Sequence, residues 1–277
     1  MHVLCLRWYV GMTVHALASR QIPGVAGHLP RLVASTVPVG SLDRATISDA
    51  FTLFSTAYEG TDRARFERDL AEKQLIILLH DSATRALKGF STVLIQPTTV
   101  GPAGTVVFSG DTVIDREYWG QKALQTAFSR ILLSLKVRSP RRPVFWFLIS
   151  KGYRTYLLLA NAFPCAVPRH DRDDDRQLAA LLDVLARGRY GSQYDARTRV
   201  IHLAASHERV REGTAPVTEA LLHNPHVQFF VDRNPGHVDG DELACLADVR
   251  LRDLARVILR IALARAGRAF GRSGSRS

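Results

Sequence analysis

Cysteines and long apolar runs are both scarce in this sequence. Its three cysteines, Cys5, Cys165 and Cys245, lie far apart and form no CxxC pair. This spacing argues against a disulfide framework and against a cysteine-based zinc site.

The longest apolar segments, residues 75–79 and 144–149, have the length of strands and fall short of the roughly 20 residues that cross a bilayer. The start of the chain also lacks the charged region and the cleavage site of a signal peptide. We therefore expect a cytoplasmic protein.

Acidic side chains are fewer than basic ones. The 277 residues include 37 Lys and Arg against 26 Asp and Glu, which gives a formal net charge of +11. A surface of this charge attracts anions, so coenzyme phosphates, nucleotides, anionic lipids and nucleic acids are the ligand classes to consider. Hydrophobic residues make up 46% of the chain, a fraction that is ordinary for a globular protein.

Composition divides the chain into four segments. Three prolines stand among glycines and serines without a sustained period in residues 1–45, which are therefore predicted to be a poorly ordered leader. Residues 46–165 carry regular apolar patterns and are predicted to form the main domain. The dense charges of residues 169–176 mark a change in character, so residues 166–250 are predicted to be an α+β extension. Residues 251–277 are predicted to form a basic amphipathic helix and a tail.

The main domain alternates between helical and strand periods. The expected elements are helices at 47–58 and 62–73, strands at 75–79, 89–95 and 105–114, a helix at 123–135, a strand at 144–149 and a helix at 153–161. The first two strands are predicted to form a hairpin, and the last strand has the continuous apolar pattern of a strand buried on both faces. This order predicts the α/β (α+β) class, with a mixed, mostly antiparallel sheet flanked by helices.

The extension has weaker patterns. Residues 178–185 favour a helix, residues 188–207 and 226–231 favour short strands, and residues 234–242 are predicted to be a loop because of their turn residues. His237, Asp239, Asp241 and Glu242 have the composition of a metal site. They lack the spacing of a calcium loop or of the HExxH motif, so a solvated turn is preferred and no metal is expected.

One segment of the main domain carries a recognisable motif. Residues 113–124 read Val-Ile-Asp-Arg-Glu-Tyr-Trp-Gly-Gln-Lys-Ala-Leu and are predicted to run from a strand through a short loop into a helix. The N–H groups at a helix N-terminus are unpaired and meet the positive end of the helix dipole, so phosphate binds there. The segment resembles the acyl-CoA signature of the GNAT acyltransferase superfamily, V-D-P-E-Y-R-G-x-G-x-G. The residues that fit are Ile114, Asp115, Glu117, Tyr118 and Gly120.

The resemblance implies that acetyl-CoA or another acyl-CoA is a co-substrate. The residues it implies for coenzyme binding are Val113, Ile114, Trp119, Gly120, Gln121, Lys122, Ala123 and Leu124. Trp119 stands where Arg or Gln is usual, and Lys122 and Leu124 stand where small residues are usual. A side chain at a glycine position crowds the pyrophosphate, whereas the Lys122 ammonium adds favourable charge, and both interpretations remain open. In the family, the strands equivalent to residues 105–114 and 144–149 splay apart and admit the pantetheine arm.

Acyl transfer from a thioester to an amine needs a base, an acid for the thiolate and an oxyanion donor. The resemblance implies backbone N–H groups around Val113 and Ile114 as the donor. Asp111, on the same strand, is the candidate base, and a solvated edge-strand carboxylate is the alternative interpretation. Tyr156 is the candidate acid, in the helix where the family often has a tyrosine, and a place at the edge of the core is its alternative.

The C-terminal helix places an apolar stripe beside the arginines Arg252, Arg256 and Arg260. Such a helix binds an anionic membrane or packs its stripe on the domain. Nucleic acid is less favoured, because the arginines lack interleaved aromatic residues. The sequence predicts an acyltransferase that moves an acyl group from acyl-CoA or an acyl carrier protein to an amine of a small-molecule acceptor. The alternatives are a non-catalytic GNAT-like scaffold and a peripheral membrane acyltransferase with a long-chain or lipid-linked substrate.

Overall fold

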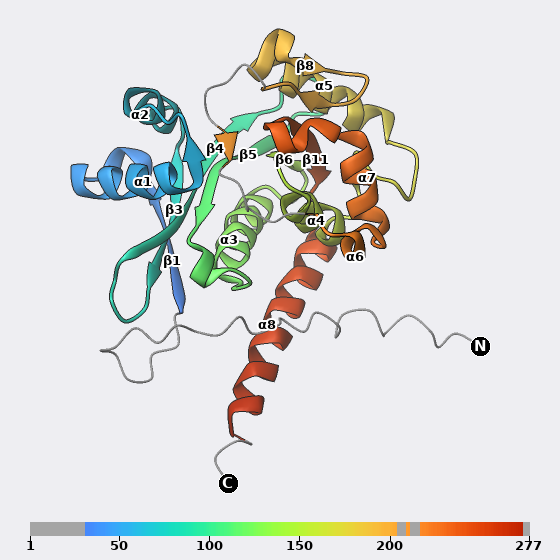
Figure 1. Cartoon of the computed structure of the whole chain (residues 1–277). Helices are drawn as coiled ribbons and strands as arrows, with labels where there is room; N and C mark the ends of the chain where they lie inside the picture. The colour runs from blue at the N-terminus through green and yellow to red at the C-terminus, as the bar shows by residue number, and fades with distance from the viewer. Residues whose placement is uncertain (1–30, 204–208, 211–216, 274–277) are drawn as a thin grey trace.

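The molecule is built around a central sheet (Figure 1). The computed structural model describes residues 31–203, 209–210 and 217–273. The strands are β1 (Leu32–Pro38), β2 (Tyr58–Glu59), β3 (Leu75–Asp81), β4 (Leu87–Pro97), β5 (Thr105–Ile114), β6 (Val144–Ser150), β7 (Ala166–Val167), β8 (Tyr194–Asp195), β9 (Val200–Ile201), β10 (Arg209–Val210) and β11 (Glu242–Asp248). The sheet has the order β1-β3-β4-β5-β6-β11-β9-β8, with β7 also paired to β11 and with β2 and β10 in a separate pair. Only β5 and β6 are parallel among the described strand pairs. The predicted mixed, mostly antiparallel sheet is confirmed.

The helices cover both faces of this sheet. They are α1 (Arg44–Ala57), α2 (Arg63–Ala71), α3 (Ala123–Arg138), α4 (Tyr153–Ala162), α5 (Arg176–Tyr190), α6 (Glu219–Leu222), α7 (Pro225–Arg233) and α8 (Leu251–Ser273). The hairpin of β3 and β4, the strands β5 and β6, and the helices α3 and α4 lie where the apolar patterns predicted them.

Side chains along each strand point alternately to the two faces of the sheet, so the core forms two layers. Ile77 and Leu79 of β3 face a large cluster that includes α3, α4 and the buried residues of α7. Their neighbours Ile76 and Leu78 face the opposite way, onto α1 and α2. Phe108 and Phe147 also lie on that second face and pack against α5. The helices α1 and α2 thus share one face of the sheet with α5, and β5 and β6 lie between them.

The leader prediction is wrong for the residues of 1–45 that the structure describes. Residues 32–38 form β1, which pairs with the whole of β3 from Leu32 opposite Asp81 to Pro38 opposite Leu75. Proline is tolerated there because β1 is an edge strand and Pro38 is its last residue. Residues 39–45 then lead into α1, whose N-cap is Asp43. Residues 1–30 lie outside the described part of the chain.

The boundary near residue 165 does not separate two sheets. The strand β11 pairs with β6 from Leu243 opposite Ser150 to Asp248 opposite Phe145, so the predicted extension completes the sheet of the main domain. Two smaller predictions in this region are also wrong. Residues 226–231 lie in the helix α7, because Asn224 caps it and Pro225 begins it. The predicted loop at 234–242 ends earlier, since Glu242 begins β11.

The predicted C-terminal helix is confirmed as α8. Asp253 and Leu254 are buried where the helix leaves the body, and Arg260 donates a hydrogen bond of 3.2 Å to the carbonyl oxygen of Asn161. Ile258, Leu259 and Leu263 are exposed, and the helix extends well beyond the rest of the molecule in Figure 1. Among the described residues, no helix has the length and apolar character needed to span a membrane.

Candidate active site

The strands β5 and β6 separate near the middle of the sheet. Their parallel pairing runs from Thr105 opposite Val144 to Ser109 opposite Leu148. Beyond this point β5 continues along β4 to Ile114, whereas β6 continues along β11 to Ser150. The two strands therefore splay apart towards their carboxyl ends, which is the arrangement implied by the resemblance to the GNAT family.

A bulge in β5 lies at the start of this splay. Thr112 pairs with Ser91 and Ser109 pairs with Val93, so Gly110 and Asp111 together lie opposite the single residue Thr92. A β-carbon on Gly110 would collide with the hydroxyl of Thr92 and would lie 3.1 Å from Cε of Lys73. A side chain at this position would therefore force Thr92 or the strand itself to shift, and the bulge lies where the pairing of β5 with β6 ends.

The backbone of β5 offers hydrogen-bonding groups to the splay. The N–H of Asp115 donates to the carbonyl oxygen of Lys88 in β4. Because the direction of these groups alternates along a strand, those of Thr112 and Ile114 point away from β4 and towards the splay. Ile114 was expected as an oxyanion donor, and its N–H has the required direction. The N–H of Val113, the other expected donor, points towards β4, whereas the N–H of Thr112 points towards the splay.

The loop between β5 and α3 contains the residues expected to hold the coenzyme phosphates. Gly120 has a φ of +83°, a conformation that favours glycine. Lys122 is the N-cap of α3 but makes no side-chain capping hydrogen bond, so the first N–H groups of this 16-residue helix remain available at the loop. Ala123 is the first helical residue. Leu124 is buried in the core, so its side chain points away from this loop.

Two further residues of the loop contact the rest of the protein. Gln121 accepts a hydrogen bond of 2.8 Å from the N–H of Leu32, which ties the loop to β1. The indole N–H of Trp119 donates a hydrogen bond of 2.8 Å to the carbonyl oxygen of Ile114. The guanidinium carbons of Arg116 and Arg154 lie 5.8 and 5.0 Å from the centre of the Trp119 ring. Both arginines are exposed, so positive charge from the loop and from α4 meets at this end of the splay.

The opposite face of the splay carries a cluster of charged and aromatic side chains. The ammonium nitrogen of Lys151 lies 3.2 Å from a carboxylate oxygen of Glu242 and 4.7 Å from the centre of the Tyr58 ring. Asp111 lies near enough to help raise the pKa of Lys151 and of Tyr190, although burial has the larger effect on each and lowers the pKa of the lysine. We call Tyr58, Asp111, Lys151, Tyr190 and Glu242 the acceptor-side cluster.

A second charge network joins α2 to α5 beside this cluster. The fully buried ammonium group of Lys73 lies 2.7 Å from a carboxylate oxygen of Asp69. Arg189 of α5 reaches the same carboxylate at 3.2 Å and Glu72 at 3.4 Å. The guanidinium of Arg189 also lies 4.5 Å from the centre of the Phe108 ring. These contacts hold the helices on either side of the acceptor-side cluster together.

Tyr156 does not lie in the acceptor-side cluster. Its side chain is fully buried, and its hydroxyl donates a hydrogen bond of 3.3 Å to the carbonyl oxygen of Pro168. The ring packs against Phe229 and Phe230 of α7. Burial raises the pKa of its hydroxyl far above the usual range. The structure thus places Asp111 and Tyr156, the two expected catalytic residues, in different environments.

The acidic segment expected to be a solvated turn is largely buried. Asp241 and Glu242 are both buried. Asp241 binds His202 at 2.7 Å, whereas Glu242 binds Lys151, so the prediction of a solvated turn is wrong for these two residues. Within the described residues, no group of three or more His, Cys, Asp or Glu side chains is arranged to hold a metal ion.

Local sequence patterns indicate the other members of the cluster only weakly. Lys151 directly follows the buried strand β6, and a charged residue at the carboxyl end of a buried strand is a signal that could have identified it. Glu242 and Tyr190 reach the cluster through the pairing of β11 with β6 and through the packing of α5. No local pattern in the sequence indicates either contact.

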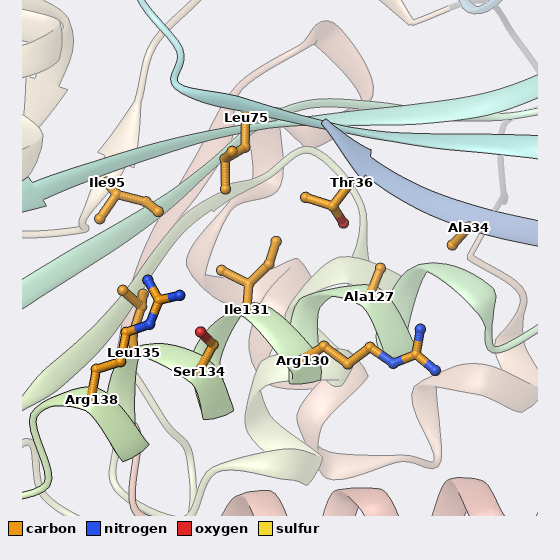
Figure 2. A pocket seen from close by; sticks show the side chains of 10 residues that line it. All are labelled: Ala34, Thr36, Leu75, Ile95, Ala127, Arg130, Ile131, Ser134, Leu135 and Arg138. Carbon is orange, nitrogen blue, oxygen red and sulfur yellow. The ribbon is translucent and has the colours of Figure 1, made fainter. Parts of the chain in front are cut away.

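A groove of about 450 Å³ lies between α3 and the sheet (Figure 2). Leu75 and Ile95 line it from the strands, Ile131 and Leu135 line it from α3, and Arg130 and Arg138 lie at its border. It lies along the second half of α3, away from the loop that precedes the helix, and is distinct from the splay.

Known proteins resemble this chain at the level of structure. No protein-family model and no curated protein matches its sequence. The solved structures that match include a probable N-acyltransferase from Enterococcus faecalis, with 16% identity, a TM-score of 0.36 and coverage of 46% of this chain and 32% of that one. The match thus spans under a third of that protein. A GNAT family N-acetyltransferase from Escherichia coli in complex with CoA has 14% identity, a TM-score of 0.33 and coverage of 48% and 68%. An acyl-CoA N-acyltransferase from Pseudomonas aeruginosa has 14% identity, a TM-score of 0.36 and coverage of 48% and 88%.

These likenesses are partial, and the fold is assigned from this chain's own topology. The order of α1, α2, β3, β4, β5, α3, β6 and α4 is the one that the apolar patterns predicted, and the splay between β5 and β6 is the feature that the resemblance implied. The chain has a GNAT-type fold, completed by a C-terminal segment that adds β11 to the sheet.

Proposed function

We propose that this protein is an N-acyltransferase that binds an acyl-CoA thioester in the splay between β5 and β6 and transfers the acyl group to an amine. The observation that carries the proposal is the end of the β5–β6 pairing at Ser109 and Leu148. Beyond this point β5 is not paired with β6, and its backbone on that side is accessible beside the N-terminus of α3. A helix N-terminus and an open strand edge are both suited to a phosphorylated, amide-containing arm.

The two faces of the splay have different roles in this proposal. The phosphates bind at the loop before α3, where the backbone N–H groups, Lys122, Arg116 and Arg154 supply positive charge. The backbone N–H of Ile114 points into the splay and stabilises the oxyanion that forms when the amine attacks the thioester carbon. Asp111 accepts the proton that the attacking amine loses. The acceptor is a small-molecule amine that approaches from the acceptor-side cluster.

Calorimetry with CoA, acetyl-CoA and longer acyl-CoA thioesters tests the binding step. At least one of them is expected to bind wild-type protein. Arg154→Glu is expected to weaken that binding by at least about tenfold, because a hydrogen bond to a charged group contributes roughly 1.5–3 kcal/mol. Arg138→Glu makes the same change of charge at the far end of α3 and is expected to bind like the wild type. Absence of heat with every thioester would overturn the proposed function.

The release of CoA thiol in the presence of a panel of amines tests the transfer step. With a thioester that binds, Asp111→Asn is expected to lower the rate of thiol release by about 10²-fold or more, the usual contribution of a positioned general base. Binding of the thioester by the same variant should change little. If Asp111→Asn releases thiol as fast as the wild type, the base is another group.

A further inference from the structure

The side chain of Lys151 combines a buried ion pair with access to the splay. It is the first residue after β6, and β6 has already parted from β5 at that point. The Lys151 side chain is 22% exposed, whereas its partner Glu242 is only 4% exposed. The lysine is therefore the member of the pair that a molecule in the splay is able to reach.

The charged and titratable groups that interact with Lys151 all favour its ammonium form. Burial by itself lowers the pKa of the lysine, but Glu242, Tyr58 and Asp111 outweigh this effect and raise the pKa above its ordinary value. They approach from β11, β2 and β5, and Tyr190 of α5 interacts with Glu242 and Asp111 in the same cluster. The second carboxylate oxygen of Glu242 is buried and has no hydrogen-bond partner among the described residues. Burial raises the pKa of Glu242 and Lys151 lowers it, and Lys151 is its ion-pair partner.

A thioester reaction in the splay needs a group that protonates the departing sulfur or stabilises it as a thiolate, and the tyrosines of α4 are poorly placed for this role. The hydroxyl of Tyr156 is held by Pro168 within the core. The ring of Tyr153 is also buried, and its oxygen accepts a hydrogen bond of 3.3 Å from the guanidinium of Arg154. Lys151 directly follows β6, past the end of the β5–β6 pairing, and its ammonium group supplies positive charge to the departing sulfur.

We propose that the ammonium group of Lys151 stabilises the thiolate that leaves when the acyl group is transferred, with Glu242 as the residue that positions it. The inference rests on the proposed function. The amine nitrogen forms a bond to the thioester carbon and loses its proton to Asp111. The carbon–sulfur bond then breaks, and the sulfur keeps the electron pair and leaves as a thiolate beside the Lys151 ammonium. Asp111 then gives the proton it took from the amine to the thiolate, directly or through water, so the net products are the amide and the free thiol.

The pKa of the thiol of bound CoA tests this assignment without an acceptor amine. The ultraviolet absorbance of the thiolate is followed as a function of pH for free CoA, for CoA bound to wild-type protein, and for CoA bound to Lys151→Met. In the wild type, the bound thiol is expected to titrate at least about one pH unit below free CoA, because an opposite charge within roughly 4–6 Å shifts a pKa by this amount. In Lys151→Met, this lowering is expected to disappear.

Three further variants sharpen the result. Lys151→Arg keeps the positive charge and should keep the lowered thiol pKa. Glu242→Gln keeps the lysine but removes the carboxylate that positions it, so part of the lowering of the thiol pKa should be lost. Lys136→Met removes a lysine at the far end of α3 and should behave like the wild type. If CoA binds but its thiol titrates like free CoA in the wild type, the role of Lys151 is overturned and the proposed function stands. If CoA does not bind at all, both fail. The wild-type measurement decides the matter even if Lys151→Met does not fold.

Discussion

The indole N–H of Trp119 donates a hydrogen bond of 2.8 Å to the carbonyl oxygen of Ile114, the last residue of β5. This carbonyl points towards the splay, so a coenzyme that lies along β5 must compete with the indole for it. We therefore expect acyl-CoA binding to change the tryptophan fluorescence of the protein. Trp119→Phe should abolish the change, and Trp8→Phe, outside the described residues, should preserve it. A change that survives Trp119→Phe would contradict this prediction.

The side chain of Arg169 stabilises the end of α4. It is 6% exposed and donates hydrogen bonds to the carbonyl oxygens of Ala160 and Phe163 at 2.6 and 3.3 Å. Two more bonds, at 2.7 and 2.8 Å, join it to the carboxylate of Asp171. Arg169→Leu should lower the free energy of unfolding by about 2–4 kcal/mol, because it leaves buried acceptors and a carboxylate without their donor. Denaturant unfolding measures this loss.

Arg172→Leu is the matched control for that measurement. Arg172 lies 3.5 Å from the same carboxylate, but its side chain is 50% exposed. Pairs at such exposed positions contribute about 0–1 kcal/mol. If the two variants lose the same stability, the buried hydrogen bonds of Arg169 are not the cause of the effect.

The elements that could be predicted from the sequence are those whose apolar pattern is local. The strands β3, β4 and β6 are bounded apolar runs, and α3 repeats its apolar residues at helical spacing. The strand β1 was missed because Pro38 and the polar residues around it suggested a loop, although an edge strand tolerates both. The helix α7 differs from the predicted strand because its apolar residues also fit a strand pattern, whereas Asn224 caps the helix and Pro225 begins it.

The candidate site was predictable only in part, for the same physical reason. Asp111 and the loop at 115–122 could be identified because a strand, a loop and a helix follow one another in the sequence. Lys151 and Glu242 meet only because β11 pairs with β6, with Leu243 opposite Ser150. That pairing joins segments far apart in the chain, and it depends on tertiary packing that no short motif records.

The His226 ring makes stability depend on pH. Burial is the main cause of a pKa lowered to about 4, and the nearby His170 and Arg169 lower it further. Between pH 6.5 and 4 the unfolded chain binds a proton that the folded protein does not, so stability falls as the pH falls through this range. The loss is at most about 1.4 kcal/mol per pH unit for a single proton. Above pH 6.5 this residue should have no effect.

The comparison of two histidine variants isolates this contribution. His226→Gln should flatten the decline of the unfolding free energy between pH 6.5 and 4, measured by denaturant titration at each pH. His223→Gln changes an exposed histidine three positions earlier and should leave the slope unchanged. Equal slopes for the wild type and His226→Gln would show that another group titrates.

The close contact between Gly110 and Thr92 makes the shape of the splay testable. Gly110→Ala places a methyl group against the hydroxyl of Thr92 and near the buried side chain of Lys73, and the neighbouring strand has little room to move. We expect a loss of about 1–3 kcal/mol in the free energy of unfolding, the usual cost of overpacking. We also expect weaker binding of acyl-CoA, because the strand that lines the splay must shift. Gly40→Ala is the control, since a β-carbon there meets nothing within 4 Å. If Gly110→Ala binds acyl-CoA as tightly as Gly40→Ala, the bulge in β5 does not shape the coenzyme site.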